Sequence, residues 1–118
     1  MNQINNNEHY ERLRRRRDEV MMTREHLKKE QRVVDENTDW IDQAAYENRI
    51  GLLGDLADWY TQEMARIDDA LVRFAEGTYG ICLACHAPIG SQRLRVAPEA
   101  AFCADCQKVR EELTHLQG

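Results

Sequence analysis

Hydrophobic residues recur every three or four positions from about residue 10 to residue 76, which is the periodicity of amphipathic helices. Between about His9 and Glu36 the repeat has the a and d rhythm of a coiled coil. Its positions are Tyr10, Leu13, Arg17, Val20, Arg24, Leu27, Gln31 and Val34. Three of these eight positions are polar, although long arginine stems can cover apolar surface. The pattern predicts one helix that packs loosely.

A second repeat predicts a helix from about Asp39 to Glu76. Its positions are Ile50, Leu53, Ala57, Tyr60, Met64, Ile67, Leu71 and Phe74. The intervening sequence D-E-N-T-D at 35–39 supplies turn and N-cap residues. Two helices of matching rhythm and a short link predict an antiparallel coiled-coil hairpin.

The position of the turn sets the register of this hairpin. A turn centred at Asn37 and Thr38 places Tyr10 opposite a point near Ala65, so that the second helix extends past the first. Its last apolar residues then need another partner, which we expect from a short C-terminal helix. The apolar face of that helix consists of Val109, Leu113 and Leu116.

A rival turn lies at Gly51 and Gly54, since glycine weakens the interior of a helix by about 1 kcal/mol relative to alanine. The apolar repeat nevertheless passes through Leu53 and Ala57 without a break, and that stretch holds no cluster of capping residues. We therefore favour the earlier turn.

All four cysteines of the chain lie in two C-x-x-C pairs separated by 17 residues. They are Cys82, Cys85, Cys103 and Cys106. This is the spacing of a four-thiolate zinc site, in which one structural Zn²⁺ holds a loop-rich segment too small to fold alone. The alternatives are two disulfides or a redox-active pair. They are less favoured, because the N-terminal sequence is polar rather than signal-like and a redox motif needs only one pair.

Composition narrows the function. The chain of 118 residues has a net charge of −5, and residues 39–76 carry nine acidic side chains against three basic ones. An acidic balance argues against direct DNA binding. No apolar run reaches the roughly 18 residues that span a membrane, so we expect a cytoplasmic protein. Neither a phosphate-binding glycine loop nor an H-E-x-x-H motif occurs, so we expect no enzymatic activity.

The cysteine segment reads G-T-Y-G-I-C-x-x-C, then A-P-I-G-x-x-R-L, then A-P-E-A-A-F-C-x-x-C, and it resembles the zinc module of the DksA/TraR family of bacterial transcription regulators. The family's D-x-x-D-x-A motif is matched by Asp39, Asp42 and Ala44. The resemblance implies a coiled-coil hairpin on a four-cysteine zinc head. It also implies binding to RNA polymerase, with the tip of the hairpin inserted into the secondary channel.

This resemblance assigns the tip residues Asp39, Asp42 and Ala44 to the neighbourhood of the polymerase active centre. A purely structural alternative makes Asp39 the N-cap of the second helix and places Asp42 at its third position. Further candidates for polymerase contact are Trp40, Arg93 and Arg95. Members that bind ppGpp often have lysine after the last cysteine, whereas this chain has Gln107, which argues against a response to ppGpp.

The sequence thus predicts a mainly α protein. Its parts are a disordered lead-in at 1–7, a coiled-coil hairpin at 8–76 with its tip near 36–44, and a zinc-finger head with a C-terminal helix at 77–118. The predicted function is regulation of transcription through RNA polymerase. The alternative is a zinc-stapled coiled-coil adaptor that binds another protein.

Overall fold

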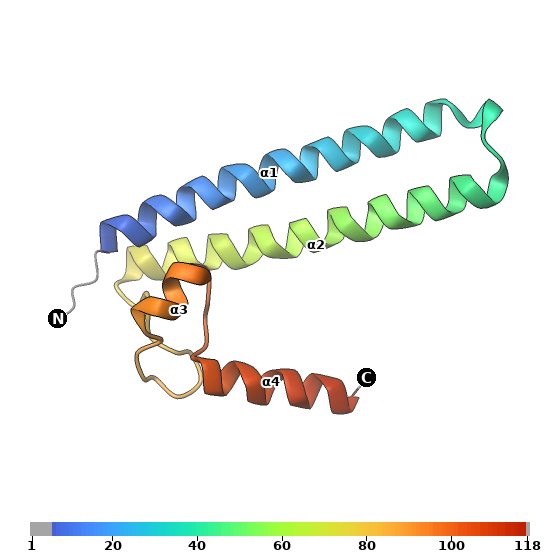
Figure 1. The fold of residues 1–118 in the computed structure, drawn as a ribbon. Coiled ribbons are helices and arrows are strands. Elements are labelled where there is room, and N and C mark those ends of the chain that lie inside the picture. The colour runs from blue at the N-terminus through green and yellow to red at the C-terminus, as the bar shows by residue number, and fades with distance from the viewer. Residues whose placement is uncertain (1–5, 118) are drawn as a thin grey trace. The chain divides into compact units, whose positions relative to one another are not determined.

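The computed structural model describes residues 6–117, apart from the side chains of Asn6, Trp40 and Gln117. Its elements are α1 (Asn6–Glu36), a 3-10 helix η1 (Thr38–Trp40), α2 (Gln43–Glu76), α3 (Ser91–Val96) and α4 (Ala104–Gln117) (Figure 1). Within this range, β structure is limited to one isolated bridge between Ile81 and Pro88. The mainly α prediction is confirmed. No helix of the described range is both long enough and apolar enough to cross a membrane.

The chain divides into two compact units. The hairpin unit spans Arg16–Ala65, and the head unit combines the chain up to Arg15 with the chain from Arg66 onward. The start of α1 and the end of α2 therefore belong to the head unit, together with all four cysteines.

In the hairpin unit, α1 and α2 run side by side in opposite directions (Figure 1). The predicted a and d positions are buried or half-buried throughout, which confirms the coiled-coil pattern. One charged pair also lies between the helices, because Glu63 is buried and its carboxylate accepts a hydrogen bond of 3.0 Å from Arg16. Nearer the turn, Arg49 pairs with Glu30 at 3.3 Å.

The connection between α1 and α2 differs in detail from the prediction. The backbone N–H of Asn37 donates to the carbonyl of Val34, and the Asn37 amide donates to the carbonyl of Val33. The 3-10 helix then delays the start of α2 until Gln43, rather than Asp39 as predicted. Both Gly51 and Gly54 lie inside α2, so the rival turn is excluded.

The predicted register at the base of the hairpin is wrong. Tyr10 does not lie opposite the region of Ala65, because its ring contacts the ring of Phe74, with centroids 5.3 Å apart. The connection occupies residues 37–42 and is centred later than the predicted turn, which shifts every pairing toward the end of α2. The start of α1 thus covers the last turns of α2 within the head unit.

The start of α1 also lies earlier than predicted. The helix begins at Asn6, inside the predicted lead-in at 1–7, and residues 1–5 lie outside the described range. Glu8 in its first turn favours helix formation there, because a negative charge interacts favourably with the helix N-terminus.

The C-terminal helix α4 is present as predicted, but its apolar face is not covered. Val109, Leu113 and Leu116 are 53%, 55% and 83% exposed. The expected contact with the end of α2 is replaced by the start of α1. The first half of α4 contacts the rest of the head unit, where the Arg110 guanidinium lies 4.2 Å from the centroid of the Phe102 ring.

Candidate metal centre and hairpin tip

The first cysteine pair lies on a tight turn of the head unit. The N–H of His86 donates to the carbonyl of Cys82 (3.0 Å), and the N–H of Cys85 points at the Cys82 sulfur (3.5 Å). His86 closes the turn with a φ of 64°, a region that non-glycine residues rarely adopt. The turn aims both sulfurs to one side.

The second pair repeats this arrangement at the start of α4. The N–H of Cys106 lies 3.5 Å from the Cys103 sulfur, and the N–H of Gln107 donates to the Cys103 carbonyl at 2.9 Å. The backbone N–H of Leu83 donates a hydrogen bond of 2.9 Å to the carbonyl of Ala101, which joins the two cysteine segments. The helical start of α4 therefore positions one pair and a loop turn positions the other.

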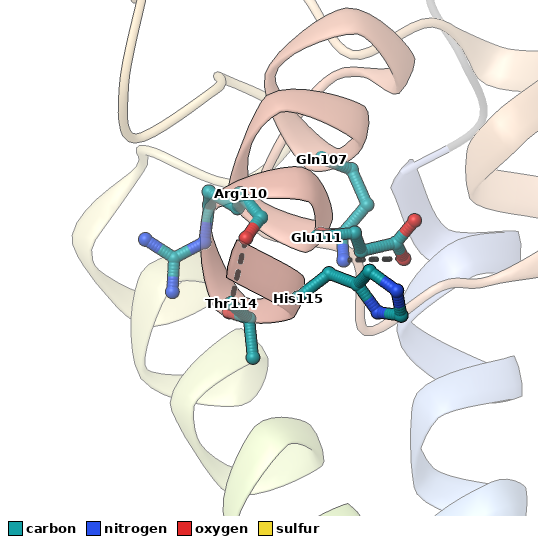
Figure 2. Close-up of a pocket in the computed structure, with 5 residues that line it drawn as sticks. All are labelled: Gln107, Arg110, Glu111, Thr114 and His115. Atoms are coloured by element: carbon teal, nitrogen blue, oxygen red, sulfur yellow. Dashed lines mark hydrogen bonds between the residues drawn. The ribbon is translucent and has the colours of Figure 1, made fainter. Parts of the chain in front are cut away.

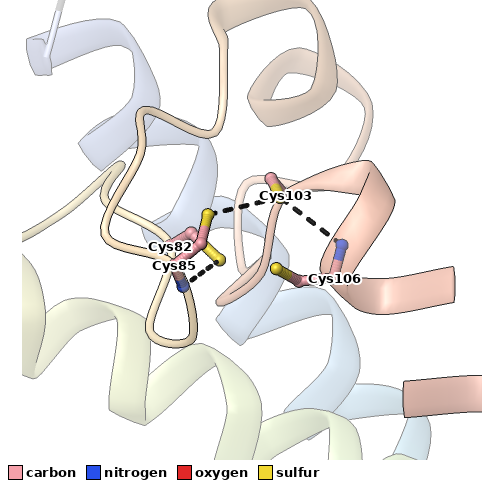
Figure 3. Close-up of side chains that lie close together, drawn as sticks. All are labelled: Cys82, Cys85, Cys103 and Cys106. Carbon is pink, nitrogen blue, oxygen red and sulfur yellow. Dashed lines mark hydrogen bonds between the residues drawn. The ribbon is translucent and has the colours of Figure 1, made fainter. Parts of the chain in front are cut away.

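The four sulfurs converge on one point (Figure 3). All lie within 4.8 Å of one another, and the Cys85 and Cys103 sulfurs are 3.8 Å apart. A tetrahedral zinc ion with Zn–S bonds of about 2.3 Å separates its ligand sulfurs by about 3.8 Å. All four residues are free thiols, which fits metal ligation rather than the two disulfides considered above.

The electrostatics of the cluster also suit a cation. The backbone N–H of Cys85, the largest influence, and other backbone donors lower the pKa of the Cys82 thiol to about 6. In contrast, the neighbouring Cys103 sulfur is the main cause that raises the pKa of Cys106 to about 12. Thiolates this close together repel each other, so the cluster as a tetrathiolate needs a positive ion at its centre.

A small apolar cluster supports the cysteine loops. Buried Ile89 and Leu94 pack with Cys82. Leu94 comes from α3, a short helix that was not predicted from the sequence. The Nε of Arg93 donates to the Phe102 carbonyl at 2.9 Å. Arg93, a predicted contact candidate, thus has a partner inside the head unit, while Arg95 is exposed.

Tyr79, which was not among the predicted site residues, joins several parts of the head unit. Its ring centroid lies 4.5 Å from that of Phe74 and 6.0 Å from that of His9. Its hydroxyl donates a hydrogen bond to the Pro98 carbonyl at 2.8 Å. Burial raises the pKa of Tyr79 to about 12. An aromatic residue three positions before the first cysteine was the available signal, since such a residue can bury a ring against the loops.

The tip residues lie in the hairpin unit, whereas the four cysteines belong to the head unit. Asp39 lies in the 3-10 helix, and Asp39, Asp42 and Ala44 are all exposed. The side chain of Trp40 lies outside the described part of the structure. The tip therefore presents two carboxylates to solvent.

Capping of α2 is carried out by Asp42 rather than Asp39. The Asp42 carboxylate accepts a hydrogen bond of 2.9 Å from the N–H of Ala45, three residues after it. The N–H of Tyr46 donates to the Asp42 carbonyl at 2.9 Å. The alternative that Asp39 caps α2 is therefore wrong. The Tyr46 hydroxyl in turn donates to Asp35, which ties the first turn of α2 to the last turn of α1 and raises the pKa of Tyr46.

A surface hollow of about 710 Å³ is bordered by one face of α4 (Figure 2). Its lining residues are Gln107, Arg110, Glu111, Thr114 and His115. The Gln107 amide donates to Glu111 at 3.0 Å, and the Thr114 hydroxyl donates to the Arg110 carbonyl at 3.0 Å. None of the predicted site residues lines it, so we assign it no role.

Comparisons with known proteins agree with this geometry. Residues 77–112 match the family described as the prokaryotic dksA/traR C4-type zinc finger. The RNA polymerase-binding transcription factor DksA of Caulobacter vibrioides is 33% identical over 86 residues, which are 73% of this chain and 58% of the relative. The protein of the same name from Buchnera aphidicola is 32% identical over 73 residues, 62% of this chain and 48% of the relative.

The similarity to a solved structure extends further along the chain. The transcription factor DksA2 from Pseudomonas aeruginosa superimposes with a TM-score of 0.83 at 28% identity, covering 93% of this chain and 85% of that one. The chain spans only about half to three fifths of the length of the curated relatives it matches. Residues 77–112 thus carry the zinc finger of the DksA/TraR family, and the chain shares the fold of the transcription factor DksA2.

Proposed function

We propose that this protein is a bacterial transcription regulator that binds RNA polymerase and modulates initiation without catalysing a reaction. The observation that carries the proposal is the combination of a four-cysteine head with a hairpin whose turn exposes two carboxylates. Curated relatives that are 33% and 32% identical to this chain are named RNA polymerase-binding transcription factors. Such a partner would place the chain in the cytoplasm.

In this proposal one Zn²⁺ is held by Cys82, Cys85, Cys103 and Cys106. The donor set fits, because four convergent thiols with sulfur separations near those of a tetrahedron are typical of closed structural sites. A zinc ion bound there would cross-link two loop segments whose apolar cluster is small. The metal then maintains the head and takes no part in a reaction.

The hairpin tip is the proposed regulatory element. A narrow pair of helices can enter a channel that excludes a globular domain, and we propose that it enters the secondary channel of the polymerase. There Asp39 and Asp42 would act near the active centre, because carboxylate oxygens suit hydrogen-bond donors and hard divalent cations. Ala44 would permit close approach, while Trp40 and Arg95 are further candidates for contact. We propose no role for ppGpp.

The test is binding to bacterial core RNA polymerase together with transcription in vitro. The wild type and Asp39→Asn/Asp42→Asn are compared, and asparagine is chosen because it also caps helices well. We expect both proteins to bind, and the variant to lose the effect on transcription. Absence of wild-type binding would overturn the proposal. A variant that regulates as the wild type does would overturn the role of the tip alone.

A further inference from the structure

An apolar stripe on α2 is left uncovered in the hairpin unit. Leu52, Leu56 and Trp59 are 61%, 40% and 49% exposed. Because they are spaced by four and then three positions, they lie on one side of the helix. We call these three residues the α2 stripe. It lies beside the face that packs on α1, where Leu53 and Ala57 are buried.

The fold of the hairpin gives no reason for the α2 stripe. The contact between α1 and α2 is already formed by the predicted a and d positions, and none of the three stripe residues belongs to that set. The indole of Trp59 meets the ring of Tyr60 edge-on, with centroids 4.9 Å apart, which restrains it before any partner binds. Exposed tryptophan and leucine held in this way are typical of interaction surfaces.

The charges around the α2 stripe indicate the chemistry of its partner. Within α2 no lysine or arginine occurs between Ile50 and Ala65, and Arg49, three positions before Leu52, is paired with Glu30. Asp55 and Asp58 are exposed on the side of the stripe that faces away from Leu53 and Ala57. The third acidic residue of this stretch, Glu63, is paired with Arg16. A complementary partner therefore presents apolar side chains bordered by lysine or arginine.

We propose that the α2 stripe is a second docking surface, which packs against an apolar, basic-rimmed patch of RNA polymerase. The inference rests on the proposed function and adds to it a contact along the side of the hairpin, separate from the tip. A second copy of this chain fits the stripe less well, because two stripes facing each other would bring the Asp55 and Asp58 carboxylates of both copies together.

The experiment measures the affinity of the full chain for core RNA polymerase. Leu56→Gln/Trp59→Gln removes two apolar groups from solvent-exposed positions, so the fold should persist, which thermal unfolding checks. We expect binding to weaken by about tenfold or more, as for other buried interface anchors. The matched control is Val72→Gln, which replaces another exposed apolar residue of α2 outside the stripe and should bind as the wild type does.

Two further measurements separate docking from a structural role. Hydroxyl-radical footprinting should show Trp59 protected when polymerase is bound. Asp55→Asn/Asp58→Asn should weaken binding at low salt and make it less sensitive to salt, because charges at the rim act through long-range attraction. The tip variant Asp39→Asn/Asp42→Asn should retain both the affinity and the protection.

The outcomes distinguish the two proposals. If the wild type does not bind polymerase, both are overturned. If it binds and Leu56→Gln/Trp59→Gln binds equally well, this inference alone fails. Sedimentation of the chain alone gives a third outcome, since a dimer that the same variant dissociates would assign the α2 stripe to a second copy and contradict the proposal.

Discussion

Asp42 connects the fold of the hairpin with its proposed action, because one side chain serves both. Its carboxylate caps α2 through the N–H of Ala45, and it is exposed beside Asp39 at the turn. The sequence alone predicted both aspartates at the tip, and its capping alternative named Asp39, whereas the structure has the cap at Asp42. The 3-10 turn at Thr38–Trp40 moves the helix start by several residues, and no periodic signal marks such a turn.

Substitution of Asp42 should separate its two roles. Asp42→Ala removes the cap and should lower the free energy of unfolding by about 1 kcal/mol, whereas Asp42→Asn should change it by only a few tenths. Urea unfolding measures both values. The corresponding substitutions at Asp39 should have little effect on stability. Equal losses for Asp42→Ala and Asp42→Asn would show that the carboxylate charge, rather than the cap, stabilises α2.

His9 gives the head unit a dependence on pH. Its imidazole is buried beside Tyr79, and its Nδ1 has no hydrogen-bond partner within the described part of the chain. Burial holds the pKa of His9 below its ordinary value of 6.5; nearby Arg12 and Arg95 act in the same direction, and Glu8 opposes them. The folded state therefore favours the neutral form, so this contribution to stability is present above pH 6.5 and is lost as the pH falls.

His9→Phe should flatten this pH dependence, since phenylalanine keeps an aromatic ring without a titrating group. Thermal unfolding between pH 7 and pH 5 should show the wild type losing stability faster than the variant. His26→Gln, at an exposed position, is the control and should keep the wild-type slope. Identical slopes for the wild type and His9→Phe would contradict the argument.

Among the elements, α4 illustrates the limit of apolar periodicity. The pattern of Val109, Leu113 and Leu116 identified the helix correctly, but the face is exposed. Spacing along the sequence shows which residues lie on one face of a helix. It does not show whether another element packs against that face. Here the start of α1 occupies the end of α2, and this arrangement follows from the register of the hairpin.

This difference predicts unequal effects of two leucine substitutions in the head unit. Leu113→Gln should change the free energy of unfolding by less than about 0.5 kcal/mol, as is usual for surface positions. Leu94→Ala should cost about 2–5 kcal/mol, because Leu94 is buried against the cysteine loops. Denaturant unfolding of the zinc-loaded protein measures both. A large loss for Leu113→Gln would mean that α4 is covered in solution.

For the whole molecule, the two units correspond to two sequence patterns, namely the cysteine spacing for the head unit and the apolar repeat for the hairpin unit. The cysteine spacing predicted the converging thiols of the head, because four ligands of one ion must meet at a point. The apolar repeat predicted the hairpin, because both helices keep their a and d positions in phase. What remained unpredicted, namely α3, the register and the role of Tyr79, depends on loops whose geometry no periodicity encodes.

Metal removal should therefore affect the two units differently. Chelation, or Cys103→Ser, should disorder the loops from Gly77 to Cys103, because their apolar cluster is small. Residues 16–65 should remain folded, since their helix packing includes no cysteine. Residue-resolved NMR before and after chelation measures this, with zinc addition as the control for reversibility. Unchanged head signals, or loss of both units together, would contradict the expectation.

The ion pair between Arg16 and Glu63 has a consequence for the alignment of the two helices. Apolar repeats tolerate sliding, because a shift of seven residues again places apolar positions opposite one another. Such a shift would separate the buried Glu63 carboxylate from Arg16, which disfavours the shifted register. Replacing both residues by leucine would then give a hairpin of similar or greater stability that has lost its protection against slippage. The link at residues 37–42 sets the register of the two helices, and the Arg16–Glu63 and Arg49–Glu30 pairs oppose sliding in a way that apolar contacts alone do not.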